Sequence, residues 1–273
     1  MDTKCTEFLA ECVRTNEPVA LLMVIENKGS SPGKTGAMMA IKDADTIAGT
    51  IGGGNLEIKA IKSALTCLAK GENKEIHYTL DDQNDHDDHS MRCGGDIRIF
   101  IKTFQPKSQL ILVGAGHISL ELYELGIQQD FRITVVDDRE ELLSRLRFPQ
   151  AQRIITDDIP EALQKLNIDE NCFITIATRS HDIDRLALEA AVSSNAVYVG
   201  MIGSTSKIKG TFRYLLDQGI TKEKISQIYA PMGLNIASRK PKEIAISILS
   251  EILLVKNEGT PEHMRQVKNI LVD

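Results

Sequence analysis

The segment Gly114-Ala115-Gly116-His117-Ile118-Ser119 is the feature that most constrains how this chain can fold. It follows the apolar run Leu110–Val113 and opens a helical pattern, which is the setting that a phosphate-binding turn of the Rossmann type requires. Gly114 permits the tight turn, Gly116 lets a phosphate approach the backbone, and Ser119 puts another small residue at the strand-helix contact. The segment therefore predicts a nucleotide-type binding turn whose helix N-terminus favours an anion. The alternative is a doubly wound scaffold whose turn binds no ligand.

After this turn, short apolar runs alternate with helical segments. The runs are Leu110–Val113, Arg132–Val136, Arg153–Thr156, Cys172–Ala177, Ala196–Ile202 and Ile228–Pro231. This alternation is typical of a parallel sheet with helices on both faces. A last helical pattern, Pro241–Lys256, begins with proline in its first turn, as helices often do. We therefore predict an α/β fold with a C-terminal, Rossmann-like, doubly wound parallel sheet.

Ligands of open α/β sheets bind beyond the carboxyl ends of the strands, where the strand order reverses. Asp137 ends the second run, about 20 residues after the last glycine, where an acid commonly holds a ribose hydroxyl. This acid favours NAD over a 2′-phosphorylated dinucleotide.

Two histidines and two cations also follow strand ends: His117, His181, Arg179 and Lys207. We expect them to face one crevice, where they position an anionic ligand or transfer protons near neutral pH. A structural alternative exists for His181, because His181-Asp182 equally well begins the helix that runs to Val192.

The segment Thr103–Gln109 divides the chain, because Pro106 and small polar residues separate two apolar runs there. We predict two domains, residues 1–105 and 106–273. The first half contains strand-like runs at Val19–Glu26, Ala37–Ile41 and Asp96–Ile101, and the apolar helix face of Leu56–Leu68. It is therefore predicted to be a small α+β N-terminal domain.

Two further glycine clusters lie in this first domain. Gly52, Gly53 and Gly54 stand directly before the amphipathic helix, and three glycines there suggest that a ligand comes close to the backbone. Arg92–Asp96 places Cys93 beside Gly94, Gly95 and a cation, a setting that lowers a thiol pKa. The alternative for Cys93 is a buried structural cysteine, the role that we also expect for Cys5, Cys12, Cys67 and Cys172.

Two other polar segments are predicted to be loops. Gly29–Gly36 resembles a P-loop, but three residues separate Gly29 from Gly33-Lys34-Thr35 where four are needed, and a strand follows. It is an ordinary strand connection, or it presents Lys34 to an anion. The acidic run Asp81–His89 has no known ligand spacing, so we predict a solvated loop and no metal site.

Composition excludes several classes of protein. The chain has 38 acidic and 32 basic residues and no basic run, which disfavours nucleic acid and anionic membranes as partners. Its five cysteines form no C-x-x-C pair, and the N-terminal segment has no apolar signal core. No apolar stretch is long enough to span a membrane, so we expect a cytoplasmic protein.

Taken together, these motifs resemble the XdhC/CoxI family, the accessory proteins of molybdenum hydroxylases such as xanthine dehydrogenase. The resemblance covers nearly the whole chain, through "GSSPGKTGAMM", "GTIGGGNLE", "RCGGDIRIFI", "LVGAGHIS", "TVVDDR", "GMIGSTSK" and "APMGLNIASRKPKEIAISILSEIL". One branch of the family carries cysteine where this chain has Asn55.

The resemblance implies a protein that binds the molybdenum cofactor, a pterin with a phosphate or a dinucleotide tail, protects it during sulfuration and delivers it to an apo-hydroxylase. A cysteine desulfurase and the hydroxylase are the implied partners. The implied binding residues are Gly52, Gly53, Gly54, Cys93, Gly94, Gly95, Gly114, Gly116, His117 and Asp137.

Three functions follow as hypotheses. The first is a cofactor-insertion chaperone, expected to be a homodimer and a maturation factor without turnover of its own. The second is an NAD-dependent oxidoreductase in which His117 or His181 donates a proton, with Cys93 as a further candidate for chemistry. The third is a nucleotide-sensing scaffold that docks a hydroxylase.

Overall fold

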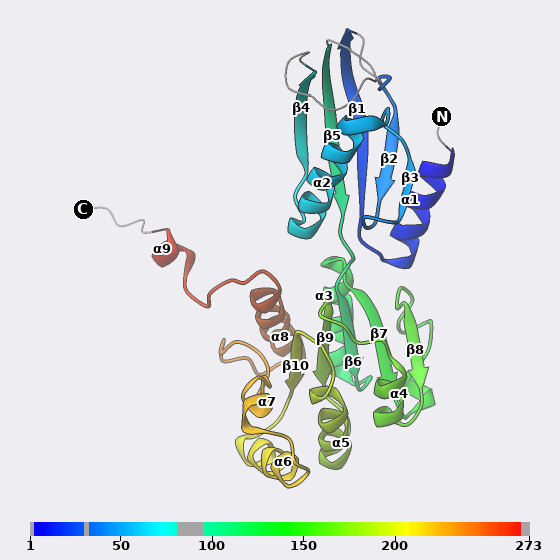
Figure 1. The fold of residues 1–273 in the computed structure, drawn as a ribbon. Coiled ribbons are helices and arrows are strands. Elements are labelled where there is room, and N and C mark those ends of the chain that lie inside the picture. The colour runs from blue at the N-terminus through cyan, green and yellow to red at the C-terminus, as the bar shows by residue number, and fades with distance from the viewer. Residues whose placement is uncertain (1–2, 30–32, 81–94, 269–273) are drawn as a thin grey trace, which may run out of the picture. The chain divides into compact units, whose positions relative to one another are not determined.

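The computed structural model describes residues 3–29, 33–80 and 95–268. The chain divides into two compact units, Met1–Pro106 and Lys107–Asp273 (Figure 1). No helix in the described ranges is both long and apolar enough to span a membrane.

The first unit is built on a five-stranded antiparallel sheet with the order β3-β2-β1-β5-β4. Its strands are β1 (Val19–Gly29), β2 (Met38–Ile41), β3 (Ile47–Gly49), β4 (Lys74–Leu80) and β5 (Gly95–Phe104). The long central pair runs from Val19 opposite Phe104 to Gly29 opposite Gly95. The glycine before the first loop therefore lies beside the glycine that opens β5.

Two helices cover this sheet, and the alternation of side chains along each strand decides which face each helix buries. Helix α2 (Gly54–Lys70) packs on the face that carries Leu22, Ile97, Ile99 and Ile101. Helix α1 (Thr3–Thr15) packs through Cys5 and Cys12 on the opposite face, against Val19 and Ala40. The predicted helix face of Leu56–Leu68 is confirmed, whereas α1, β3 and β4 were not predicted.

The second unit is built on a parallel sheet with the order β10-β9-β6-β7-β8. Its strands are β6 (Gln109–Val113), β7 (Arg132–Asp137), β8 (Arg153–Thr156), β9 (Cys172–Ile176) and β10 (Tyr198–Met201). Counted from β6, this is the Rossmann order 3-2-1-4-5, and the order reverses between β6 and β9. The predicted fold class is confirmed.

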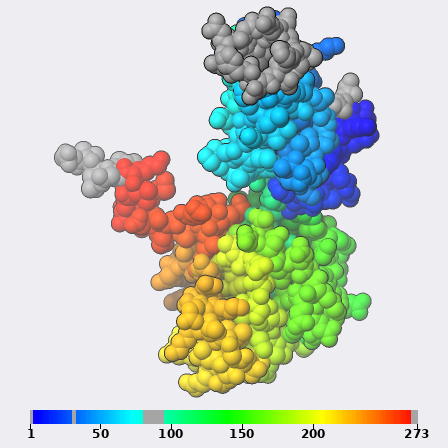
Figure 2. Space-filling view, in the orientation of Figure 1, coloured from blue at the N-terminus to red at the C-terminus, as the bar shows by residue number. Residues whose placement is uncertain are grey.

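Helices cover both faces of this parallel sheet. Helices α3 (His117–Gln128) and α8 (Pro241–Lys256) pack on one face, with the core of Leu110, Leu112, Leu122 and Ile248. The opposite face carries α4 (Ile159–Lys165), α5 (His181–Val192) and α6 (Thr205–Asp217). Helices α6 and α7 (Lys222–Ser226) lie on the surface of this unit, in yellow and orange in Figure 2. Two short elements complete the unit, the 3-10 helix Glu140–Leu142 and α9 (Met264–Val267).

The sixth apolar run, Ile228–Pro231, does not become a full strand. Tyr229 makes a single parallel bridge to Gly200, donating its N–H to Val199 and accepting the N–H of Met201. Two residues later Pro231 has no N–H to donate, so the ladder cannot continue through it. The run therefore extends the sheet at one position only.

Candidate functional site

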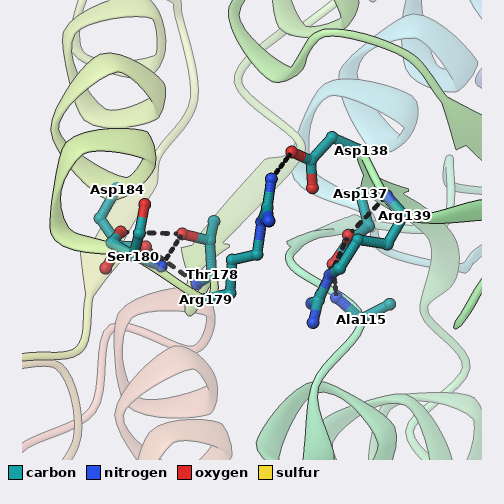
Figure 3. Close-up of polar contacts among 8 residues, drawn as sticks. All are labelled: Ala115, Asp137, Asp138, Arg139, Thr178, Arg179, Ser180 and Asp184. Atoms are coloured by element: carbon teal, nitrogen blue, oxygen red, sulfur yellow. Dashed lines mark hydrogen bonds and ion pairs between the residues drawn. The ribbon is translucent and has the colours of Figure 1, made fainter.

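The candidate site lies at the carboxyl ends of β6, β7 and β9, around the point where the strand order reverses (Figure 3). Three short segments meet there: Gly114–Gly116 after β6, Asp137–Arg139 at the end of β7, and Thr178–His181 after β9. Because β6 lies between β9 and β7, its glycine turn is flanked on both sides by charged residues.

The two glycines of the turn have different structural roles. Gly114 has a φ of +101°, and a Cβ there would lie 2.3 Å from the carbonyl oxygen of Ala177, so only glycine fits between β6 and β9. Gly116 is the N-cap of α3 with a φ of −72°, and an added Cβ would meet nothing within 4 Å. As a glycine, Gly116 has no side chain to cap α3, so this residue leaves the N–H groups of the first turn available to another acceptor.

Asp137 is turned inward onto this glycine turn. Its side chain is 1% exposed and accepts four hydrogen bonds. Oδ2 accepts the Ala115 N–H at 2.6 Å and Nη2 of Arg139 at 2.8 Å. Oδ1 accepts the backbone N–H and Nε of Arg139, both at 2.9 Å. The carboxylate therefore fixes the turn and the arginine together.

These bonds control the protonation of Asp137. Burial raises the pKa of the carboxyl group, but hydrogen bonds from the Arg139 side chain, the Ala115 N–H and the Arg139 N–H outweigh burial and lower the pKa below its ordinary value. The ribose contact expected of Asp137 stays a prediction. In this structure both carboxylate oxygens of Asp137, which a ribose hydroxyl would need as acceptors, already accept hydrogen bonds from the protein.

An ion pair crosses the end of β6. Nη2 of Arg179, after β9, lies 2.6 Å from Oδ2 of Asp138, at the end of β7 (Figure 3). Since β9 and β7 are the two neighbours of β6, this pair joins the loops on either side of the glycine turn. Arg179 therefore lies at the carboxyl ends of the strands with an acidic partner, and its expected contact with a ligand stays a prediction.

Lys207 has a structural partner in Asp184, which sequence reasoning missed. Nζ of Lys207 pairs with Oδ2 of Asp184, and Oδ1 of Asp184 accepts the Thr178 N–H at 2.8 Å. Asp184 is fully buried on α5, beside Ala187 and Leu188. A carboxylate among the buried positions of an amphipathic helix was the signal in the sequence, because an acid is rarely buried without a partner.

The two candidate histidines begin different helices. His117 is the exposed first residue of α3, directly after Gly116. His181 is the exposed first residue of α5, behind the N-cap Ser180, whose side chain accepts the N–H of Ile183. Nε2 of His181 lies 3.8 Å from a Cβ added at Gly210 of α6. The structure thus places His117 at the turn and His181 beside α6.

The triple-glycine turn of the first unit holds a carboxylate of its own chain. Gly52, Gly53 and Gly54 have φ values of 131°, 80° and 66°, which explains the glycines by backbone conformation. Oε2 of Glu57 accepts three hydrogen bonds there, from Thr50 Oγ1 at 2.5 Å, Gly53 N at 3.0 Å and Ile51 N at 3.1 Å. The turn is an anion-binding nest whose anion is the Glu57 side chain.

The glycine motifs of the first unit meet at one end of its sheet. A Cβ at Gly33 would lie 2.3 Å from the carbonyl oxygen of Ile51, so this loop packs against the triple-glycine turn. Gly95 pairs with Gly29 in the same region. Cys93, Gly94 and the acidic run Asp81–His89 lie outside the described residues, so their expected roles stay predictions.

The four described cysteines, Cys5, Cys12, Cys67 and Cys172, are buried. Burial raises the pKa of the Cys172 thiol to about 11, which keeps it protonated and unreactive at neutral pH. Within the described ranges, no group of three or more His, Cys, Asp or Glu side chains is arranged to hold a metal ion.

Comparison with protein families identifies this architecture. Residues 110–252 match the family described as the XdhC Rossmann domain, and residues 12–79 match the XdhC and CoxI family. The chain therefore belongs to the XdhC and CoxI family.

Individual relatives agree with this assignment. The chain is 32% identical to the Escherichia coli protein YqeB over 251 residues, 92% of this chain and 46% of YqeB. A Bacillus subtilis protein named as a probable xanthine dehydrogenase component is 31% identical over 155 residues, 57% of this chain and 45% of that protein. The chain thus spans about half the length of these two relatives.

Two more distant relatives match over most of their length. The molybdenum cofactor insertion chaperone PaoD of Escherichia coli is 21% identical over 280 residues, 91% of this chain and 87% of PaoD. A crystal structure described as a xanthine dehydrogenase from Bacillus halodurans has the same fold, with a TM-score of 0.51 and 21% identity. The match covers 97% of this chain and 99% of that one.

Gly114 and Gly116, in the glycine turn before α3, should differ sharply in how much stability is lost on substitution by alanine. Gly114→Ala introduces both a strained φ and a clash with Ala177, so we expect it to lower the free energy of unfolding by more than about 2 kcal/mol. Gly116→Ala should cost less than about 1 kcal/mol. Urea denaturation measures both, and equal losses would contradict the structure of the turn.

Removing the Glu57 carboxylate should destabilise the triple-glycine turn before α2. Glu57→Ala leaves the Thr50, Ile51 and Gly53 donors without their acceptor, so we expect a loss of about 1–2 kcal/mol in the free energy of unfolding. The exposed Glu72→Ala is the matched control and should change it by less than about 0.5 kcal/mol. If the two variants unfold alike, Glu57 does not support the turn.

The contribution of Asp137 should depend on pH. Because its folded-state pKa is lowered, Asp137→Asn should reduce stability by about 2 kcal/mol at neutral pH. This difference is present above the unfolded pKa, about 3.9, and is lost as the pH falls through the folded pKa. Thermal unfolding from pH 7 to 2.5, with the exposed Asp217→Asn as control, measures it. A stability difference between the wild type and Asp137→Asn that grows on acidification would contradict the lowered pKa of Asp137.

Proposed function

We propose that this protein is an accessory protein of a molybdenum hydroxylase, which binds the molybdenum cofactor and delivers it to the apo-enzyme. The observation that carries the proposal is the glycine turn at the N-terminus of α3, open at Gly116 and flanked by Arg139 and Arg179. Family membership and the relative named as a cofactor insertion chaperone support it.

The residues at this turn fit a phosphorylated pterin. A phosphate is an anion, and it is favoured by N–H groups at a helix N-terminus and by nearby arginines. Gly116 leaves room for it, since no atom lies within 4 Å of an added Cβ. The bound cofactor would supply the molybdenum centre that the hydroxylase needs, while Gly116, His117 and Arg139 would hold its phosphate.

The charged groups around the turn suit binding and release better than turnover. Asp137 is bonded to Ala115 and Arg139, and Asp184 is bonded to Thr178 and Lys207. General acid–base catalysis needs a group poised to exchange its proton, whereas these carboxylates serve as acceptors of structural hydrogen bonds. This arrangement leaves the exposed His117 and His181 as the candidate proton donors of an NAD-dependent oxidoreductase, and family membership favours the maturation factor over it.

The finer parts of the proposal concern partners and sulfur. We propose that the cofactor is sulfurated while it is bound, by a cysteine desulfurase, and that Cys93 is the thiol of this protein closest to that chemistry. This choice is supported by the burial of the other four cysteines, all of them described residues, which makes them poor candidates for sulfur chemistry. We further propose a cytoplasmic homodimer.

Binding of the cofactor tests the proposal directly. Molybdenum cofactor released from a purified molybdenum hydroxylase is titrated anaerobically into the protein and followed by calorimetry. We expect micromolar or tighter binding, weakened at least about tenfold by Gly116→Asp, which places a carboxylate at the open position. Gln128→Asp, an exposed position in the last turn of α3, is the matched control and should bind like the wild type.

Two results would contradict the proposal. One is the absence of binding at cofactor concentrations of about 100 μM, far above the range that a chaperone of this affinity would need. The other is Gly116→Asp with wild-type affinity, which would place the cofactor away from the glycine turn.

A further inference from the structure

Two hydrogen-bond donors of the second unit meet on a single oxygen atom. Oδ2 of Asp137 accepts the Ala115 N–H at 2.6 Å and Nη2 of Arg139 at 2.8 Å (Figure 3). The Arg139 guanidinium and the Ala115 N–H of the glycine turn therefore share one acceptor atom. The second contact of the guanidinium, from Nε to Oδ1 of Asp137 at 2.9 Å, fixes the plane of the group as well as its position.

Arg139 keeps hydrogen-bonding capacity after these contacts. A guanidinium has five N–H donors, and the bonds to Asp137 engage only Nε and Nη2. Among the described residues, Nη1 has no hydrogen-bond partner, and the side chain is 26% exposed. A ligand at the turn therefore meets a cation with unused donors.

Among the described residues, the neighbouring acids Asp138 and Glu141 make no hydrogen bond to Arg139, although their charges act on its guanidinium. Asp138 directs its carboxylate to Arg179 on the other side of β6, at 2.6 Å. Glu140 and Glu141 follow in the exposed 3-10 helix. The acid closest to the turn, Asp137, is 1% exposed, and its two oxygens are bonded to Ala115 and Arg139.

The Rossmann fingerprint predicts a hydrogen-bond acceptor for the ligand at the end of β7, whereas this arrangement presents hydrogen-bond donors there. In NAD-binding domains an acid there accepts hydrogen bonds from a ribose, whereas an arginine accommodates a phosphate. Here the acid is present in sequence but is used to hold an arginine, which presents N–H donors suited to a phosphoryl group.

We propose that Arg139, positioned by Asp137, is the residue of the second unit that selects a ligand ending in a phosphomonoester over one that offers a ribose diol. This inference rests on the proposed function, for which it names the form of the cofactor: the pterin with a free terminal phosphate rather than a dinucleotide. Asp137 acts as the positioning residue and does not contact the ligand.

The test compares the pterin cofactor that ends in a phosphomonoester with its dinucleotide form, in which a nucleoside with a ribose diol covers that phosphate. Affinities for both are measured by calorimetry for the wild type, Arg139→Gln and Arg132→Gln. Arg132 is the matched control, because it begins the same strand β7 at the opposite end of the sheet. We expect the wild type and Arg132→Gln to prefer the phosphomonoester form at least about tenfold, and Arg139→Gln to lose that preference.

The possible results separate the inference from the proposed function. If the wild type binds both forms equally, or if Arg139→Gln keeps the full preference, the inference is wrong and cofactor binding stands. If the wild type binds neither form, the proposed function fails and the inference fails with it. Should Arg139→Gln not fold, Arg139→Lys decides: it keeps the charge but not the planar fork, so a reduced preference supports the inference and an unchanged one overturns it.

Discussion

The hydrogen bonds of the Asp137 carboxylate are the interaction on which the second unit depends. One carboxylate ties the end of β7 to the glycine turn after β6 and holds Arg139 against that turn. The hydrogen bond from Ala115 to Asp137 adds a side-chain link between the ends of β6 and β7 to the hydrogen bonds of their ladder. A buried acid is costly unless it is fully bonded, and here each oxygen accepts two donors.

Both units use the same physical device at their glycine motifs. In the first, the Glu57 carboxylate lies in the triple-glycine turn before α2; in the second, Asp137 binds the turn before α3. In both cases a side chain of the protein satisfies backbone N–H groups that the sequence suggested for a ligand. The difference is that α3 still opens onto free space at Gly116, which makes the second turn the better candidate for ligand binding.

The sequence predicted the second unit well because its apolar runs and glycine turn are local signals. Gly114, Gly116 and the order of strands and helices needed no knowledge of distant contacts. The direction in which a side chain points was not predictable: Asp137 occupies the position expected of a ribose-binding acid but faces inward. Its partner Arg139 is two residues away, and only the completed strand end shows that the two side chains meet. The Asp184–Lys207 pair was missed for the same reason, since it joins two helices.

We propose that this protein carries a phosphorylated molybdenum-containing pterin rather than a nicotinamide dinucleotide. The most direct measurement is native mass spectrometry of the protein purified anaerobically from its own host, followed by identification of the small molecules that it releases. We expect a pterin with a terminal phosphate and molybdenum, in a fixed ratio to the protein. Release of NAD or NADP in that ratio, with no pterin, would contradict the claim.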